Sequence, residues 1–236
     1  MSSIITLFTN LKAHMKCIWM PSDQTSVISK SPTSSSPKHK KTDIPGSHDF
    51  EKSKEQMMSE VTGQTLKKVV TNLCKLASTE RERVWLWVCT NIAYDVEFLQ
   101  KKSSWTSDHK VVFKKRKAIC AGYATLFYEM CRLAHIKCVK IHGNCKPCSI
   151  KNKSTHSWNA VCIDGAWYLI DATWGAGYVN KEQTKFIFKL ADIYFLADPV
   201  IFAKNHTPNE SKWTLLHGNT NIHPGIENEK HTAPGA

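Results

Sequence analysis

The chain of 236 residues has no run of about 18 consecutive apolar residues, the length that a membrane-spanning helix requires. Its first apolar stretch, residues 4–8, is too short for the core of a signal peptide, and no small-residue cleavage site follows a long apolar run. We therefore expect a cytoplasmic protein without a membrane span.

Acidic residues are scarce: 20 Asp and Glu stand against 32 Lys and Arg, giving a formal net charge of +12. No Asp-x-Asp-x-Asp-Gly loop occurs, so no calcium site is expected. The densest basic runs, 38–41 and 114–117, lie in no recognition-helix, zinc-finger or RNA-binding sheet signature. The positive charge is therefore interpreted as serving solubility and weak steering, and no nucleic-acid partner is expected.

The nine cysteines lack the pairing pattern of a metal site or a disulfide framework. Their number is odd, and several occupy apolar positions of helical or strand patterns. Cys145 and Cys148 have zinc-knuckle spacing, but no second pair stands at finger spacing. We expect no metal and no cofactor, and we interpret most cysteines as small buried hydrophobes in a reducing compartment.

Composition divides the chain into three parts. Residues 1–60 include the Ser/Pro-rich segment 31–37 and cannot bury enough apolar surface to offset the entropy of ordering, which predicts a disordered leader. Residues 218–236 are interpreted as a flexible tail. Residues 61–217 hold most of the eight Trp, and their length suits one catalytic domain of ordinary size.

Within the middle part, helical patterns come first and strand patterns follow. A helical stripe runs from Leu66 to Ala77, and a second helix carries Val84, Trp87, Val88 and Ile92 on one face. A polar, basic surface loop is expected over 100–117, a buried helix from Cys120, and strands over 137–142, 156–163 and 166–173, with a loop over 143–155. Helices followed by an antiparallel sheet indicate an α+β fold.

The dipeptide Asp164-Gly165 predicts a two-residue hairpin between the last two strands. With that turn, the numbers of paired residues sum to 329, so Thr173 lies opposite His156 and Asp171 lies opposite Trp158. Side chains alternate across a strand, which places His156 and Asp171 on one face as diagonal neighbours about 7–8 Å apart. An Asp beside a His can orient the ring and stabilise the imidazolium.

Cys120 is predicted at the first turn of the buried helix, on its inward stripe. The positive end of the helix dipole and a neighbouring protonated His both favour the thiolate. Backbone N–H groups at such a helix start can also form part of an oxyanion hole. The sequence therefore predicts a site for acyl transfer or peptide cleavage, with Cys120 as nucleophile, His156 as base and Asp171 as orienting acid.

The segments around these residues resemble a known family. Residues 118–124, 155–161 and 168–175 are similar to the nucleophile, His and Asp segments of the transglutaminase-like superfamily. Residues 171–177 and 194–199 resemble the kyphoscoliosis peptidase group more closely. The likeness continues through His206-Thr207-Pro208 and residues 213–216, so it covers about residues 65–216.

The resemblance implies a papain-like α+β fold, in which the nucleophile-bearing helix packs on an antiparallel sheet. It also implies a Cys-His-Asp triad and a thioester acyl-enzyme, resolved by water in a peptidase or by an amine in a transglutaminase. The closer group implies a cytoskeleton-associated cysteine peptidase with a protein or peptide substrate and cytoskeletal partners. Longer members carry further domains after the catalytic one, whereas this chain stops soon after Leu216.

Two alternatives stay open at the level of sequence. In the first, the fold is a catalytically inactive interaction module that binds cytoskeletal proteins and keeps the triad as a structural network. In the second, the enzyme is a transglutaminase, which transfers the side-chain acyl group of a glutamine in a protein to an amine. Hydrolysis and amine transfer need the same three residues and differ in how water is excluded, so residue types alone do not separate them.

Overall fold

The computed structural model describes residues 65–75, 80–146 and 154–216. The expected leader (1–60), the expected tail (218–236) and Cys148 of the zinc-knuckle pair lie outside these ranges. The described residues form the predicted α+β architecture, with helices preceding an antiparallel sheet. No helix among them is both long and apolar enough to cross a membrane.

The main sheet has four antiparallel strands in the order β5-β4-β3-β8. Its strands are β3 (Cys138–Cys145), β4 (Ser154–Ile163), β5 (Ala166–Ile170) and β8 (His206–Pro208). The predicted loop over 143–155 is therefore partly wrong, because β3 continues to Cys145 and β4 already begins at Ser154. Two small sheets pair β1 (Ala93–Tyr94) with β2 (Lys117–Ala118) and β6 (Gly177–Val179) with β7 (Phe186–Phe188).

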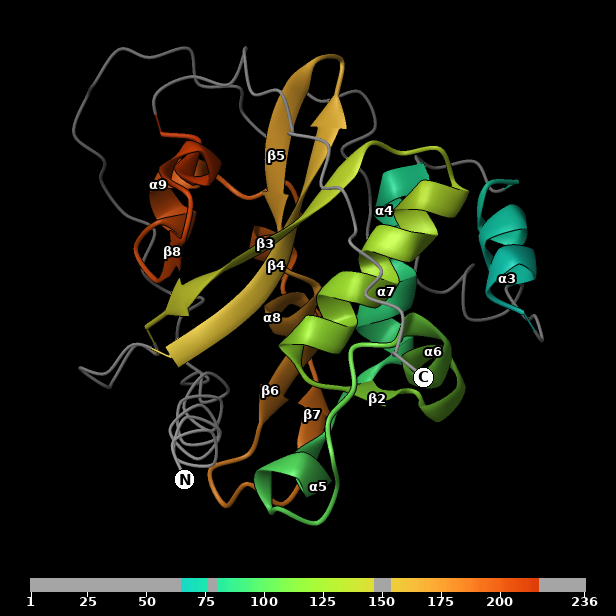
Figure 1. Ribbon diagram of the computed structural model, residues 1–236, viewed down its shortest axis with the longest axis vertical. Helices are drawn as coiled ribbons and strands as arrows, with labels where there is room; N and C mark the ends of the chain where they lie inside the picture. Colours follow the sequence, from blue (N-terminus) through green and yellow to red (C-terminus); the bar gives the residue numbers. More distant parts are fainter. Residues whose placement is uncertain (1–64, 76–79, 147–153, 217–236) are drawn as a thin grey trace, which may run out of the picture.

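Helices α3 (Leu66–Leu73), α4 (Glu80–Asn91) and α7 (Cys120–Leu133) lie on one side of the sheet, and α9 (Pro199–Phe202) lies on the other (Figure 1). In α3, Val69, Val70 and Leu73 are buried as the stripe predicts, whereas Cys74, beyond the helix end, is exposed. Helix α4 was expected to bury one face. In fact every residue from Glu82 to Cys89 is buried, since the helix lies in the middle of the helical layer.

The surface loop predicted over 100–117 is wrong in its second half. Residues His109–Lys115 form helix α6, and the chain then enters β2. The Asp108 side chain caps the helix by accepting the Lys110 N–H, and Arg116 ends it in the left-handed conformation. Val112 is completely buried, and Phe113 packs against the core by stacking on Trp87, so apolar positions among basic neighbours anchor the helix.

Helix α7 begins at Cys120, as predicted, and buries its inward stripe, including Ala124, Phe127 and Cys131. It packs against β3 and β4. Two polar contacts tie it to the rest of the core: the Tyr123 hydroxyl donates to the Ile92 carbonyl, and the Asn159 amide donates to the Ala124 carbonyl. The start of α7 is therefore held from both the helical layer and the sheet.

The predicted hairpin is confirmed as far as Ile170. Asp164 and Gly165 have φ of 50° and 84°, the turn conformation expected, and Ile163 pairs with Ala166 in the predicted register. The expected pairings of Asp171 and Thr173 are wrong, because β5 ends at Ile170. Asp171 is instead the N-cap of helix α8 (Ala172–Ala176). Its side chain accepts hydrogen bonds from the first backbone N–H groups of that helix, whereas in a continued strand those groups would pair with β4.

The remaining elements are short. They are α5 (Val96–Leu99) and the 3-10 helices η2 (Asp192–Tyr194) and η3 (Ser211–Thr214). After α9 the chain returns to the main sheet, where β8 joins the free edge of β3 with His206 opposite Cys145. This return brings the last part of the described chain beside the hairpin.

Candidate active site

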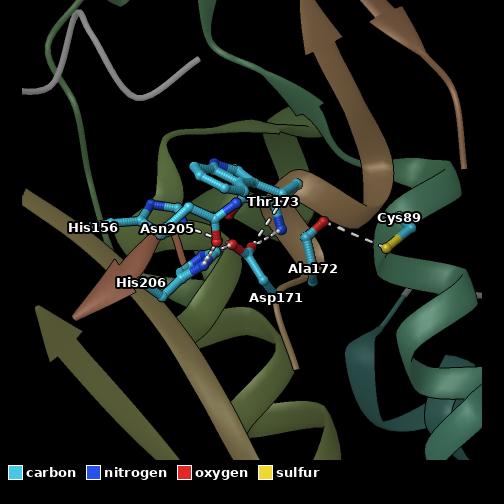
Figure 2. A network of polar contacts seen from close by, with 8 residues as sticks. Cys89, His156, Asp171, Ala172, Thr173, Asn205 and His206 are labelled. Carbon is cyan, nitrogen blue, oxygen red and sulfur yellow. Dashed lines mark hydrogen bonds and ion pairs between the residues drawn. The ribbon is translucent and has the colours of Figure 1, made fainter. Parts of the chain in front are cut away.

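Asp171 is the centre of a buried polar network (Figure 2). Its Oδ1 accepts the backbone N–H groups of Thr173 (2.8 Å) and Trp174 (3.0 Å) at the start of α8. Its Oδ2 accepts ring N–H groups from His156 (2.7 Å) and His206 (3.0 Å). Four donors therefore converge on one carboxylate that has no contact with solvent.

This environment keeps the carboxylate ionised. Burial alone raises the pKa of Asp171, because an apolar surrounding disfavours charge. Hydrogen bonds and charge interactions with His156 and His206 outweigh that cost and hold the pKa well below its usual range. Asp171 is thus an anion that orients two imidazole rings from a fixed position at a helix start.

His156 comes from strand β4 and is 2% exposed. Burial lowers the pKa of its ring, but the Asp171 carboxylate and the Cys120 thiol outweigh burial and raise the pKa well above its ordinary value. Trp158 and Trp174 flank the ring, with centroids 5.9 and 5.3 Å away. Because Nε2 donates to Asp171, the other ring nitrogen, Nδ1, is the atom left to exchange a proton with a nucleophile.

Cys120 is the first residue of α7 and is 1% exposed. Its thiol is close enough to act as a hydrogen-bonding neighbour of the His156 ring and to influence its pKa. The N-terminal end of α7 adds the positive end of the helix dipole. The fold therefore brings together the three residues that the sequence singles out. The oxyanion hole expected at this helix start stays a prediction.

His206 was not among the predicted site residues. It lies on β8, far along the chain, and reaches Asp171 from the side opposite Thr173 (Figure 2). Its ring stacks on Phe202 at a centroid distance of 3.8 Å, and its Nδ1 lies 2.7 Å from Asn205 Oδ1. In the sequence, the only signal for His206 was the family resemblance of segment 206–208. A three-residue edge strand is too short to show an alternating pattern of apolar and polar residues.

His156, Asp171 and His206 also form a group whose ligand atoms all lie within 4.8 Å of one another. Two His and one carboxylate are a donor set that zinc accepts. However, Oδ2 is 2.7 and 3.0 Å from the two nitrogens, whereas ligands on a tetrahedral zinc at ~2.0 Å lie roughly 3.3 Å apart. The distances match direct hydrogen bonds, which explain the contacts without an ion.

A second thiol, Cys89 of α4, lies on the side of Asp171 that faces away from His156 and His206 (Figure 2). It donates to the Ala172 carbonyl at 3.4 Å, and burial together with the Asp171 charge raises its pKa well above the usual value. It is therefore a neutral packing residue. The seven cysteines in the described ranges are all free thiols.

Comparisons with known proteins identify what the chain is similar to. Residues 64–172 match the model of the transglutaminase-like superfamily. Over 168 residues the chain is 38% identical to kyphoscoliosis peptidase of Mus musculus, which covers 67% of this chain and 25% of that protein. It is also 33% identical over 112 residues to hillarin of Drosophila melanogaster, covering 40% of this chain and 14% of that protein.

The chain thus spans about a quarter of the length of the kyphoscoliosis peptidases it matches. Among solved structures, a TGase is similar at 19% identity and a TM-score of 0.36, covering 62% of this chain and 37% of that one. The resemblance noted from the sequence motifs is confirmed. Residues 64–172 are a transglutaminase-like superfamily domain, and two thirds of the chain is similar to kyphoscoliosis peptidase.

Proposed function

We propose that residues 61–217 form the catalytic domain of a cysteine peptidase whose triad is Cys120, His156 and Asp171. One observation carries the proposal: a buried His156 donates to an ionised Asp171 at 2.7 Å while the thiol at the start of α7 acts on the same ring. The base thus lies between the nucleophile and the orienting acid, the spatial arrangement that acyl-transfer chemistry requires.

In the proposed reaction, the Cys120 thiolate attacks the carbonyl carbon of a peptide bond and forms a carbon–sulfur bond. The His156 imidazolium then donates its Nδ1 proton to the leaving amine as the carbon–nitrogen bond breaks, leaving a thioester. A water molecule, deprotonated by His156, attacks the thioester; the carbon–sulfur bond breaks, the carboxylic acid leaves, and the Cys120 thiolate and the His156 imidazolium are restored.

The electrostatics of the site support the thiolate form. A His156 pKa raised well above its ordinary value keeps the ring protonated at neutral pH, and a protonated ring beside Cys120 favours thiolate. Asp171 stabilises the imidazolium without taking its proton, because its own pKa is held low.

Selective alkylation tests the proposal. The full chain is treated with limiting iodoacetamide at pH 6.5, and modified peptides are quantified by mass spectrometry. We expect Cys120 to react faster than Cys138, a partly exposed cysteine of β3, even though Cys120 is nearly buried. Cys120→Ala should remove the fast phase and Cys138→Ala should leave it intact. A wild-type protein whose Cys120 reacts no faster than Cys138 contradicts the proposed nucleophile.

Amine transfer is the first rival within the same chemistry. Incorporation of a labelled primary amine into a glutamine-containing protein, lost in Cys120→Ala, identifies a transglutaminase, whereas release of a new amino terminus from a peptide identifies hydrolysis. The similarity to kyphoscoliosis peptidase supports hydrolysis.

The second rival is a catalytically inactive module that binds cytoskeletal proteins, and the burial of Cys120 to 1% exposure favours it. Under our proposal the protein is cytoplasmic, associates with the cytoskeleton and cleaves a protein partner there. Turnover of a captured cytoskeletal protein by wild type, absent in Cys120→Ala, supports the enzyme. Equal binding by both proteins without turnover supports the module.

A further inference from the structure

We infer that His206 is a positioning residue that holds the Asp171 carboxylate ionised and directed at His156. This inference rests on the proposed function. Both imidazoles bond the same oxygen, Oδ2, whereas Oδ1 is occupied by the two backbone N–H groups of α8. His206 therefore hydrogen-bonds no reacting group and acts on His156 through Asp171, although the two rings are neighbours with centroids 5.4 Å apart.

The fold fixes the His206 ring from several sides. Backbone pairing with Cys145 in β3 sets its place on the sheet edge. Phe202 stacks on the ring at 3.8 Å with an interplanar angle of 19°, and Trp174 lies 4.4 Å away. A ring so enclosed has little freedom to leave Oδ2, so the contact with Asp171 is a permanent part of the site.

The direction of the His206–Asp171 hydrogen bond follows from charge. Burial lowers the pKa of His206 to about 4, so the ring is neutral at pH 7 and carries one N–H. Three acceptors act on the ring: Asp171 Oδ2 at Nε2, Asn205 Oδ1 at Nδ1, and the Phe202 backbone; of these, the carboxylate anion is the strongest. We therefore assign the proton to Nε2, an assignment that requires the Asn205 amide to turn so that its NH2 group, in place of Oδ1, faces Nδ1.

The Nε2–H group, whose nitrogen lies 3.0 Å from Oδ2, points its positive end at the carboxylate and offsets part of the negative potential in the site. The other titratable groups that act on Asp171 are His156 from β4, and Cys89 and Tyr123 from α4 and α7. Burial raises the pKa of Cys89 and Tyr123, so both are neutral. Loss of the His206 dipole should therefore make the site more negative and raise the pKa of both His156 and Cys120.

Two substitutions separate hydrogen bonding from packing. His206→Phe keeps an aromatic ring between Phe202 and Trp174 but removes the donor, whereas His206→Gln restores an N–H near the position of Nε2. The readout is the pH dependence of Cys120 alkylation by iodoacetamide in the full chain. We expect the profile of His206→Phe to move to higher pH by about half a unit, and that of His206→Gln to return toward wild type.

Superimposable profiles of wild type and His206→Phe would overturn the inference, as would equal shifts in the Phe and Gln variants. If His206→Phe does not fold, ¹⁵N-histidine NMR of the wild type decides the question. We expect His206 to be neutral and protonated on Nε2 from pH 5.5 to 8, and an Nδ1-protonated ring would refute the inference. An unreactive wild-type Cys120 would instead refute the proposed function, whatever the tautomer of His206.

Discussion

Replacing Asp171 by Ala tests how much of the domain's stability depends on the buried network. The substitution removes the acceptor of four buried N–H groups, two from the backbone of α8 and two from imidazole rings. Loss of the helix cap costs about 1 kcal/mol. Breaking a buried ion pair by removing one partner costs about 3–5 kcal/mol in total, so we expect the free energy of unfolding to fall by that amount.

The chain offers a matched control for the cap. Asp198 begins α9 with the same geometry: its Oδ1 accepts the N–H groups of Val200 and Ile201, but its side chain is exposed and meets no histidine. Asp198→Ala should therefore cost only about 1 kcal/mol. The difference between the two variants, about 2–4 kcal/mol, measures the pairing with His156 and His206.

Urea unfolding followed by far-UV circular dichroism at pH 7 supplies both free energies. Asp171→Asn should fall between wild type and Asp171→Ala, because its amide oxygen can still cap α8 while its NH2 group no longer suits the two rings. Equal destabilisation by Asp171→Ala and Asp198→Ala would refute the reasoning, since it would mean that the imidazole contacts add nothing to stability.

Three further outcomes follow from the structure. The pKa of His156 is higher in the folded than in the unfolded protein, where it is about 6.5. The stability that protonated His156 contributes is therefore fully present below about pH 6.5 and is lost as the pH rises through the folded pKa. The difference in urea midpoint between wild type and His156→Gln should accordingly shrink from pH 6 to pH 9. Gly143→Ala should detach β8, because a Cβ there overlaps the Thr207 carbonyl oxygen and the Trp158 ring; faster hydrogen exchange at residues 206–208 checks this, and unchanged protection contradicts it. Tyr123→Phe should cost about 1–2 kcal/mol by leaving the buried Ile92 carbonyl without its donor, measured by thermal unfolding, and a neutral effect would show that the carbonyl finds another partner.

The local parts of this domain could be predicted from sequence. The Asp164-Gly165 turn determines the register of β4 and β5, because its positive φ values select a two-residue hairpin. The stripe that starts at Cys120 determines where α7 begins and which face is buried. In both cases the deciding interactions join residues close in sequence, so the pattern carries the information.

The contact between His156 and Asp171 was predicted for a partly wrong reason. Both were expected on one face of a continuous hairpin, whereas the strand ends at Ile170 and the carboxylate reaches the ring from a helix cap. An Asp after an apolar strand fits a longer strand and a cap equally well. Packing of α8 against α4, where Gly175 meets Trp85 without room for a side chain, favours the cap.

By itself, the sequence determined the α+β class, the hairpin register, the nucleophile helix and the three candidate residues, since each depends on short-range periodicity, turn chemistry or motif. Only the tertiary structure decided that β8 returns to the edge of β3 and carries His206 to Asp171. That pairing joins segments far apart in the chain. Its free energy comes from edge hydrogen bonds and from aromatic packing among Phe202, Trp174 and His206, which no local pattern records.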